Sequence, residues 1–301
     1  MNVRRTAVLF AILAGILWGT TGVFVRILSD AGMDEFTVLG SRVTISALIL
    51  LAHIGLNYKK KLQLRKRDIG LYLGGAVIGN FGLCIFSIIS VNHLSLSFAA
   101  VLRDMYPFIV MFIAAVLFKE KNTRKKMICM LFAFFGCVLI SGIFDGNHLT
   151  MDSIGLLAGI LSAFSYAAYS IFTRVLQERG NHALTITLYY MIIAAVILLP
   201  LMEWEKVFSF VSDAPFIHSG FLILHGLCTG VIPYILYAKA LQYLEAGKAA
   251  ALSTSEPAAA MVFGLLFYGE VPTIIGIGGI VIVMTSLIFL CLDKESRYTN
   301  E

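Results

Sequence analysis

The sequence predicts an all-α integral membrane protein whose ten transmembrane helices form two inverted five-helix repeats. The chain has 301 residues, of which 59% are hydrophobic and 14% charged, whereas soluble domains carry about 25% charged residues. The segment Ser97–Glu120 resembles Gly247–Glu270 at a constant offset of 150 residues. Lys and Arg also gather in alternate loops, which is typical of a multi-pass membrane protein. These three observations define the fold class.

The ten predicted helices follow from hydropathy, because a membrane helix needs about 20 mostly apolar residues. The apolar stretches are residues 7–28, 36–57, 69–91, 95–118, 125–144, 153–175, 183–202, 217–241, 247–268 and 273–292. The first stretch is longer than the core of a signal peptide, and another span follows at once, so we expect it to be retained. The segment 203–215 is expected to lie along the membrane interface or to be an ordinary connector.

The internal repeat is clearest around two prolines. The recurring residues are Ala99, Ala100, Leu102, Pro107, Met111 and Glu120 in the first copy, and Ala249, Ala250, Leu252, Pro257, Met261 and Glu270 in the second. A repeat of this kind fixes the architecture. The two units are expected to be residues 7–144 and 153–292.

The distribution of positive charge predicts the orientation. If the N-terminus lies inside, 18 of the 23 Lys and Arg residues fall in inside segments and Lys206 alone falls in an outside loop. Positive residues favour the cytoplasmic side, so both termini are expected to be cytoplasmic. Because each unit has an odd number of helices, the second is inserted upside down. Inverted repeats are typical of transporters with a site near the bilayer midplane.

Four charged residues lie deep within predicted spans: Arg42, Arg103, Asp104 and Glu256. A charge at that depth costs at least about 2.5–3.5 kcal/mol, so each needs a partner or a water-filled cavity. One interpretation is a set of internal ion pairs that serve structure alone. The other is a solute cavity whose polar wall these residues supply, and the two interpretations are compatible.

Two prolines and several tyrosines add to the candidate substrate-binding site. Pro107 and Pro257 each remove a helical hydrogen bond and are expected to kink their helices. Tyr106 precedes the first of them. The remaining candidates for lining a pocket are Tyr166, Tyr234 and Tyr237, and core packing is the alternative for each.

Motifs of soluble enzymes are absent from the sequence. It contains no P-loop and no H-E-x-x-H motif, and its five cysteines lack metal-ligand spacing. We therefore expect no enzymatic activity, no cofactor, no metal and no nucleic-acid partner.

The pattern resembles the EamA-type permeases of the drug/metabolite transporter superfamily over residues 7–292. The residues that carry the resemblance are Leu17-Trp18-Gly19-Thr20, Arg42, the small residues before Pro107 and Pro257, Glu120, Ser255-Glu256-Pro257 and Gly269-Glu270. The pair Arg103-Asp104 departs from its repeat counterpart, Ser253-Thr254, in being charged.

The resemblance implies a bacterial inner-membrane carrier, often an exporter of amino acids, other metabolites or drugs, that works by alternating access. We expect Arg42 and Arg103 to attract a carboxylate, and Asp104 or Glu256 to bind an amine or a coupling proton. Ten helices can enclose a pathway alone, so a monomer in the lipid bilayer is expected. The alternatives are a cationic-drug or multidrug exporter and, in a different class, a non-transporting membrane scaffold.

Overall fold

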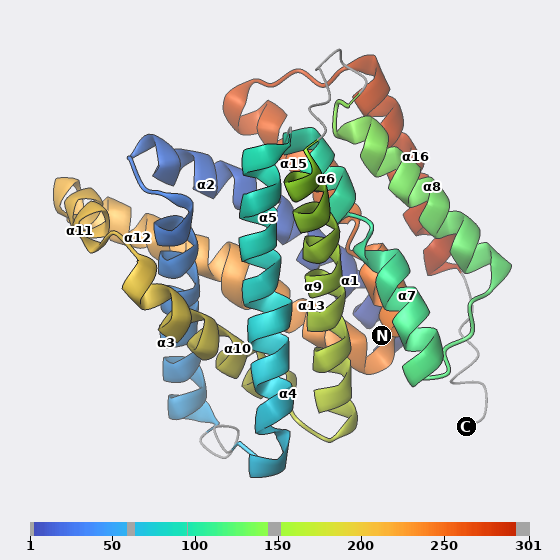
Figure 1. Cartoon of the computed structure of the whole chain (residues 1–301), viewed down its shortest axis with the longest axis horizontal. Coiled ribbons are helices and arrows are strands. Elements are labelled where there is room, and N and C mark those ends of the chain that lie inside the picture. Colours follow the sequence, from blue (N-terminus) through green and yellow to red (C-terminus); the bar gives the residue numbers. More distant parts are fainter. Residues whose placement is uncertain (1–2, 59–63, 95, 144–151, 293–301) are drawn as a thin grey trace.

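The computed structural model describes residues 3–58, 64–94, 96–143 and 152–292, and within these ranges the chain is helical, with no strand (Figure 1). The first half contains α1 (Val3–Gly19), α2 (Thr21–Asp30), α3 (Glu35–Asn57), η2 (Lys66–Asp68), α4 (Ile69–Leu73), η3 (Gly74–Phe81), α5 (Gly82–His93), α6 (Leu96–Arg103), α7 (Tyr106–Leu117) and α8 (Arg124–Ile140). The second half contains α9 (Ser153–Glu178), α10 (Ala183–Leu198), η4 (Leu199–Leu201), α11 (Trp204–Asp213), α12 (Pro215–His225), η5 (Gly226–Val231), α13 (Ile232–Tyr243), α14 (Ala246–Leu252), α15 (Ser255–Tyr268) and α16 (Ile274–Cys291).

Nine helical stretches of the described chain are long and apolar enough to cross a membrane. They are Val3–Asp30, Glu35–Asn57, Lys66–His93, Phe98–Leu117, Ser153–Glu178, Ala183–Leu201, Pro215–Tyr243, Ala246–Tyr268 and Ile274–Cys291. The helix α8 would complete the predicted ten, but it has 17 residues and is shorter than these stretches. The all-helical membrane fold is thus confirmed, while the count of ten stays a prediction.

Helices at equivalent positions in the two halves pack against each other. The pairs are α3 with α10 and α8 with α16; in the fourth span of each half, the second helix of the first half, α7, packs on the first helix of the second half, α14. In addition, α1 packs on α13 and α15, and α9 packs on α5, α6 and α7. The first helix of each half therefore lies among helices of the other half.

The same local turn ends the repeated segment in both halves. The helices α7 and α15 are followed by residues with positive φ, Lys119 at 55° and Gly269 at 64°. The next residues, Glu120 and Glu270, donate their backbone N–H to carbonyls six residues earlier, at 3.4 and 3.3 Å. The following helices, α8 and α16, each begin at a threonine whose hydroxyl accepts a backbone N–H at 3.1 Å. These caps stop one helix and start the next.

Two wide helical turns also occupy equivalent places. The π-helices η3 and η5 lie in the middle of the third span of each half. Gly79 lies so close to α9 that a methyl group on it would come within 2.7 Å of the Cα of Tyr169. Gly226 similarly faces Ile45 of α3. Wide turns of this kind often mark functional sites.

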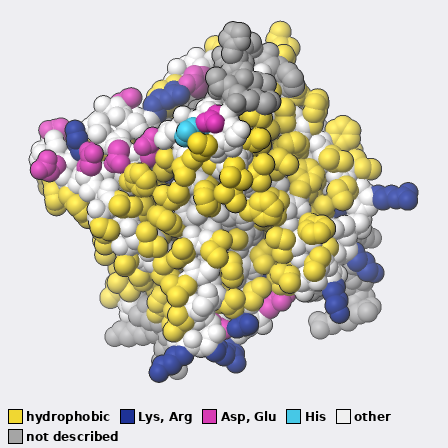
Figure 2. All heavy atoms as spheres, in the orientation of Figure 1, with side chains coloured by type: hydrophobic (Ala, Val, Ile, Leu, Met, Phe, Trp, Pro, Cys, Tyr) yellow, Lys and Arg dark blue, Asp and Glu magenta, His cyan; other side chains and the backbone are white. Residues whose placement is uncertain are grey.

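The two ends of the bundle differ in charge, with hydrophobic side chains covering the surface between them (Figure 2). We call one the basic end, where exposed cations gather: Arg65, Lys66, Arg67, Lys121, Arg124, Lys125 and Arg179. The other is the acidic end, with exposed Asp30, Glu35, Glu203, Glu205 and Asp213. Some residues used in the predictions lie outside the described ranges: Lys59, Lys60, Lys61, residue 144, Lys294 and Arg297.

The segment after the seventh predicted span forms a helix, α11, at the acidic end (Figure 1). It packs against α12 and α3. Its Phe210 is buried in a small cluster with Leu28, Val38 and Leu222, while Phe208 is 67% exposed. The segment is therefore an amphipathic helix rather than an irregular connector.

Candidate functional site

An ionic group joins the breaks in two helices. The α6 helix ends at Arg103, and a two-residue turn separates it from α7; a similar turn separates α14 from α15. The Arg103 Nη2 atom lies 3.5 Å from Asp104 Oδ1 and 3.5 Å from Glu256 Oε1. Three of the four predicted charged residues therefore meet. We call Arg103, Asp104 and Glu256 the charged bridge.

The charged bridge is loosely closed and partly accessible. Its side chains are 31%, 9% and 20% exposed, in the order Arg103, Asp104, Glu256. Both distances exceed the 2.7–2.9 Å typical of charge-assisted hydrogen bonds, and the Nε atom of Arg103 has no hydrogen-bond partner. The bridge thus has donor capacity that its internal pairs do not use.

Tyr106 connects the first helix break to the second. Its hydroxyl donates to the carbonyl of Ala250 at 3.0 Å and lies 2.5 Å from the Ser253 hydroxyl. Its ring stacks on Tyr166 of α9, with centroids 3.8 Å apart. Ser253 is the repeat counterpart of Arg103. At this repeat position the first break therefore carries a charged side chain and the second a hydroxyl.

An aromatic cluster continues from this stack. It consists of Trp18, Tyr106, Tyr166, Tyr169, Tyr234 and Tyr237, all at most 6% exposed. The ring centroid of Trp18 lies 6.0 Å from that of Tyr166, 5.3 Å from Tyr234 and 5.5 Å from Tyr237. All four tyrosines predicted from the sequence belong to it. Tyr169 lies three residues after Tyr166 and so shares its helix face, and Trp18 entered only through the family resemblance.

Arg42 lies apart from the charged bridge. It forms no ion pair with any described residue, and its Nε atom has no hydrogen-bond partner. Its guanidinium lies near the thiol of Cys84. The structure thus brings three of the four predicted charged residues together and leaves Arg42 without an ion pair among the described residues.

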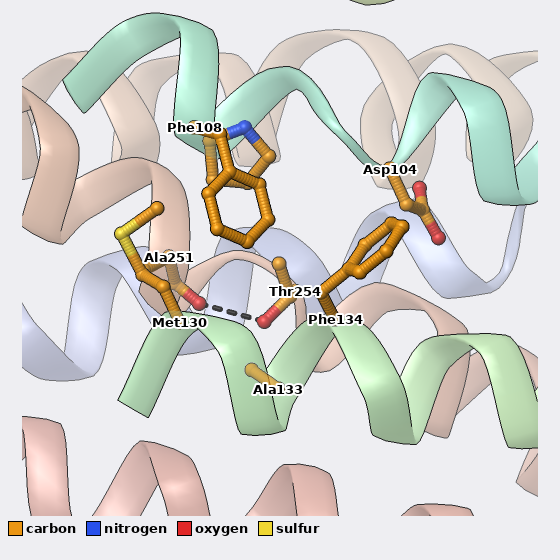
Figure 3. Close-up of a pocket in the computed structure, with 8 residues that line it drawn as sticks. Asp104, Phe108, Met130, Ala133, Phe134, Ala251 and Thr254 are labelled. Carbon is orange, nitrogen blue, oxygen red and sulfur yellow. Dashed lines mark hydrogen bonds between the residues drawn. The ribbon is translucent and has the colours of Figure 1, made fainter. Parts of the chain in front are cut away.

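A small pocket lies beside Asp104, between α7, α8 and the end of α14 with the turn that follows it (Figure 3). Its cavity volume is about 10 Å³, which is about the space of one water molecule, and its lining is mostly apolar. The lining residues are Asp104, Pro107, Phe108, Met130, Ala133, Phe134, Ala251 and Thr254. Thr254 donates its hydroxyl to the Ala251 carbonyl at 2.7 Å. Asp104 is the charged residue among those that line the pocket.

The two prolines follow the helix breaks. Pro107 lies in the first turn of α7 and Pro257 in the first turn of α15. A proline is tolerated in a first turn, where its missing N–H leaves no helical hydrogen bond unmade. They therefore start new helices beside the charged bridge and do not bend continuous ones.

Sequence reasoning missed a buried ionic network at the basic end. Lys126 Nζ lies 3.1 Å from Glu245 Oε2 and 3.9 Å from Glu120 Oε2. Glu120 also accepts the backbone N–H of Ala246, at 2.8 Å. All three side chains are at most 5% exposed, and burial raises the pKa of Glu120 above its ordinary value. Lys126 counts among the loop cations in the sequence, Glu120 appears there only as a repeat residue, and nothing in the spacing of the three residues indicates burial.

The acidic end carries an exposed pair in the equivalent place. Arg26 Nη1 lies 2.6 Å from Glu270 Oε1, with the two side chains 48% and 55% exposed. The guanidinium also lies 4.2 Å from the ring centroid of Tyr268. Elsewhere within the described ranges, no group of three or more His, Cys, Asp or Glu side chains could hold a metal ion.

The chain matches the EamA-like transporter family model over residues 5–142 and 153–292. It is 24% identical to the uncharacterized inner membrane transporter YicL of Salmonella typhimurium, covering 99% of each chain. It is 25% identical to the pseudopaline exporter CntI of Pseudomonas aeruginosa, covering 98% of this chain and 99% of the relative.

A solved structure, titled only as the crystal structure of a protein, shares the fold. Its TM-score is 0.76 at 16% identity, and the match covers 96% of this chain and 97% of the other. At that identity the likeness concerns the fold alone.

Proposed function

Since the chain belongs to the EamA-like transporter family, we propose that it exports small organic metabolites such as amino acids across the inner membrane by alternating access. Membrane transport itself follows from the family. The proposal adds a direction, a class of solute and a mechanism. It also adds two inverted repeats, residues 7–144 and 153–292, with both termini in the cytoplasm.

The observation that carries the proposal is the charged bridge between the two helix breaks. Arg103 comes from one half of the chain, and Glu256 comes from the other. A residue pair that spans both halves at their breaks can open when the halves move relative to each other. The bridge therefore couples the binding of a charged solute to that movement.

The balance of charge favours a zwitterion. The bridge has one cation and two carboxylates, and Arg42 supplies a second cation. The formal charges of these four side chains cancel, which suits a solute that carries one positive and one negative group. Glu256 or Asp104 binds the amine or a coupling proton. The aromatic cluster supplies apolar surface for the solute body.

A cationic-drug exporter is the second candidate, and one observation favours it. The charged bridge taken alone has an excess of one negative charge, and Asp104 lines the small pocket (Figure 3). A cationic solute would pair with the carboxylates of the bridge without help from Arg42. In both candidates the protein acts as a monomer in the lipid bilayer.

The test is efflux from cells that express the protein, measured for a panel of amino acids and cationic drugs at two pH values. Faster export of a zwitterion than from cells without the protein, lost in Glu256→Gln, supports the proposal. Protection against cations only would favour the second candidate. No effect on any solute, with correct membrane insertion, would favour a non-transporting scaffold.

The proposed roles of the Asp104 and Glu256 carboxylates have a separate test. If Glu256→Gln and Asp104→Asn both left the transport rate and its pH dependence unchanged, neither carboxylate would bind the amine or a coupling proton. Lys206→Gln is a matched control, because Lys206 lies at the acidic end, away from the bridge.

A further inference from the structure

A second polar group lies around Arg42, on the α3 face that packs against η5. Gly230 of η5 lies beside the Arg42 stem: a methyl group on it would come within 3.6 Å of Arg42 Cγ. The hydroxyl of Ser46, one turn further along α3, donates to the Gly226 carbonyl at 3.0 Å. The glycines of η5 therefore bring that helix close to the arginine.

Two buried side chains near Arg42 have unused hydrogen-bonding atoms. Asn80, at the end of η3, is 2% exposed; its Oδ1 atom accepts from the Tyr234 hydroxyl at 3.2 Å, but its Nδ2 atom has no partner. His225, which directly precedes η5, is 1% exposed, and neither of its ring nitrogens has a partner. Burying a polar group without a hydrogen-bond partner is unfavourable.

These side chains belong to one neighbourhood. Cys84, which lies near Arg42, follows Asn80 by four residues and so shares its helix face. Tyr234, the hydrogen-bond partner of Asn80, and His225 both lie within electrostatic range of Arg42. Glu256 of the charged bridge lies within the same range but forms no ion pair with Arg42. The π-helices η3 and η5 thus present Asn80 and His225 to the same arginine.

The unused groups are mainly donors, and they surround a cation that has no carboxylate partner among the described residues. Arg42 offers Nε–H, Asn80 offers its amide N–H, and a neutral imidazole offers one N–H. A carboxylate accepts several such bonds and supplies the missing negative charge. We propose that Arg42, Asn80 and His225 form a subsite for the carboxylate of the solute, separate from the charged bridge.

A chain of contacts connects this subsite to the charged bridge. Asn80 contacts Tyr234, which packs on Trp18; Trp18 packs on Tyr166, and Tyr166 stacks on Tyr106 beside Ser253. The aromatic cluster therefore lies between a donor-rich end and an end with two carboxylates. This inference rests on the proposed function and sharpens it: the solute has a carboxylate at one end, a cationic amine at the other and an apolar or aromatic body between them.

Three probes separate the two ends: phenylalanine, 3-phenylpropionate and phenethylamine. Binding to the purified full-length protein is measured by the fluorescence of Trp18, with Trp204 replaced by Phe so that one tryptophan reports. Asn80→Asp keeps the acceptor for Tyr234 but places a negative charge beside Arg42. We expect Asn80→Asp and Arg42→Gln each to weaken binding of the two carboxylates by at least about tenfold, which corresponds to about 1.4 kcal/mol, and to leave phenethylamine unchanged.

The matched control is Arg26→Gln, which removes an arginine at the acidic end that is already paired with Glu270. Unchanged carboxylate binding in Asn80→Asp and Arg42→Gln would overturn the subsite. Loss of all three probes in both variants would assign these residues to packing, and it would overturn the subsite as well.

The outcomes also separate this inference from the proposed function. If phenylalanine bound and Glu256→Gln abolished its binding while Asn80→Asp did not, the subsite would be wrong and the carrier proposal would stand. If phenethylamine alone bound to the wild type, both the subsite and the zwitterion would be wrong, and the cation exporter would be favoured.

Discussion

Glu120 and Glu270 occupy the same turn in the two halves of the chain, yet their surroundings are opposite. Glu120 is 5% exposed and belongs to a buried network with Lys126 and Glu245 at the basic end. Glu270 is 55% exposed and pairs with Arg26 at the acidic end. The same local sequence therefore supports a buried closure at one end and a solvent-exposed contact at the other.

The difference continues along the repeated helices. Every residue from Ala246 to Ser255, on the basic side of the second break, is buried. On the other side, Arg103 and Glu256 keep 31% and 20% of their side-chain surface exposed. Under the proposed alternating access, this asymmetry is that of a conformation closed at the basic end. The comparison can be tested at each end separately.

The largest effect is expected when the buried network loses its cation. Lys126→Met leaves Glu120 and Glu245 buried without a counter-charge, and breaking such a pair costs about 3–5 kcal/mol. Thermal unfolding in one detergent should show a clear loss of stability. Lys125→Met changes the exposed neighbour and serves as the control; equal unfolding temperatures for the two variants would contradict a structural role for the network.

Replacing Glu120 and Glu270 separately compares the stability contributions of the two ends most directly. Glu120→Ala leaves the Ala246 N–H without its acceptor and should cost about 1–3 kcal/mol. Glu270→Ala removes half of an exposed pair and should cost less than about 1 kcal/mol. The two variants are compared by thermal unfolding under identical conditions. A larger loss for Glu270→Ala would reverse the assignment of the two ends.

A smaller effect is expected at the residue before each glutamate, and replacing Lys119 by glycine should stabilise the protein. Lys119 has a left-handed conformation, with φ at 55°, where the other half has Gly269. A non-glycine residue pays about 1 kcal/mol or more for this conformation, so Lys119→Gly should raise the unfolding temperature. Gly269→Ala should lower it by a similar amount, because no atom lies near the added methyl group and only the backbone is affected. Destabilisation by Lys119→Gly would show that the lysine side chain contributes more than its backbone costs.

The smallest expected effect is a change of about a few tenths of a kcal/mol in the contribution of Glu270 to stability when the salt concentration is raised. At 1 M salt the Debye length falls to about 3 Å, so an exposed pair is largely screened. The stability difference between wild type and Glu270→Ala should shrink between 50 mM and 1 M NaCl, while that between wild type and Glu120→Ala should persist. Parallel salt dependence in both variants would mean that the two ends are equally solvated.

The sequence predicted the features that carry a strong physical penalty. Long apolar stretches and a repeated proline segment indicated the membrane fold and the family, and both are confirmed. Arg103 and Glu256 were noticed because a charge in an apolar run is costly, and the structure brings them together. The structure also brings the four predicted tyrosines into one cluster with Trp18.

Other features leave no such trace in the sequence. Glu120, Lys126 and Glu245 stand among loop charges, and only tertiary packing buries them. Asn80 and His225 are single polar residues in apolar helices, and their unused atoms become visible only when every partner is placed. The π-helices contain glycines in close contact with neighbouring helices, and hydropathy does not report such contacts.

The measurement that tests the account most directly is uptake of labelled phenylalanine into proteoliposomes that contain the purified protein. The account predicts uptake above that of protein-free vesicles by the wild type and by Arg26→Gln, and loss of that uptake in Glu256→Gln. Equal uptake by the wild type and Glu256→Gln would contradict the claim that the charged bridge binds the solute.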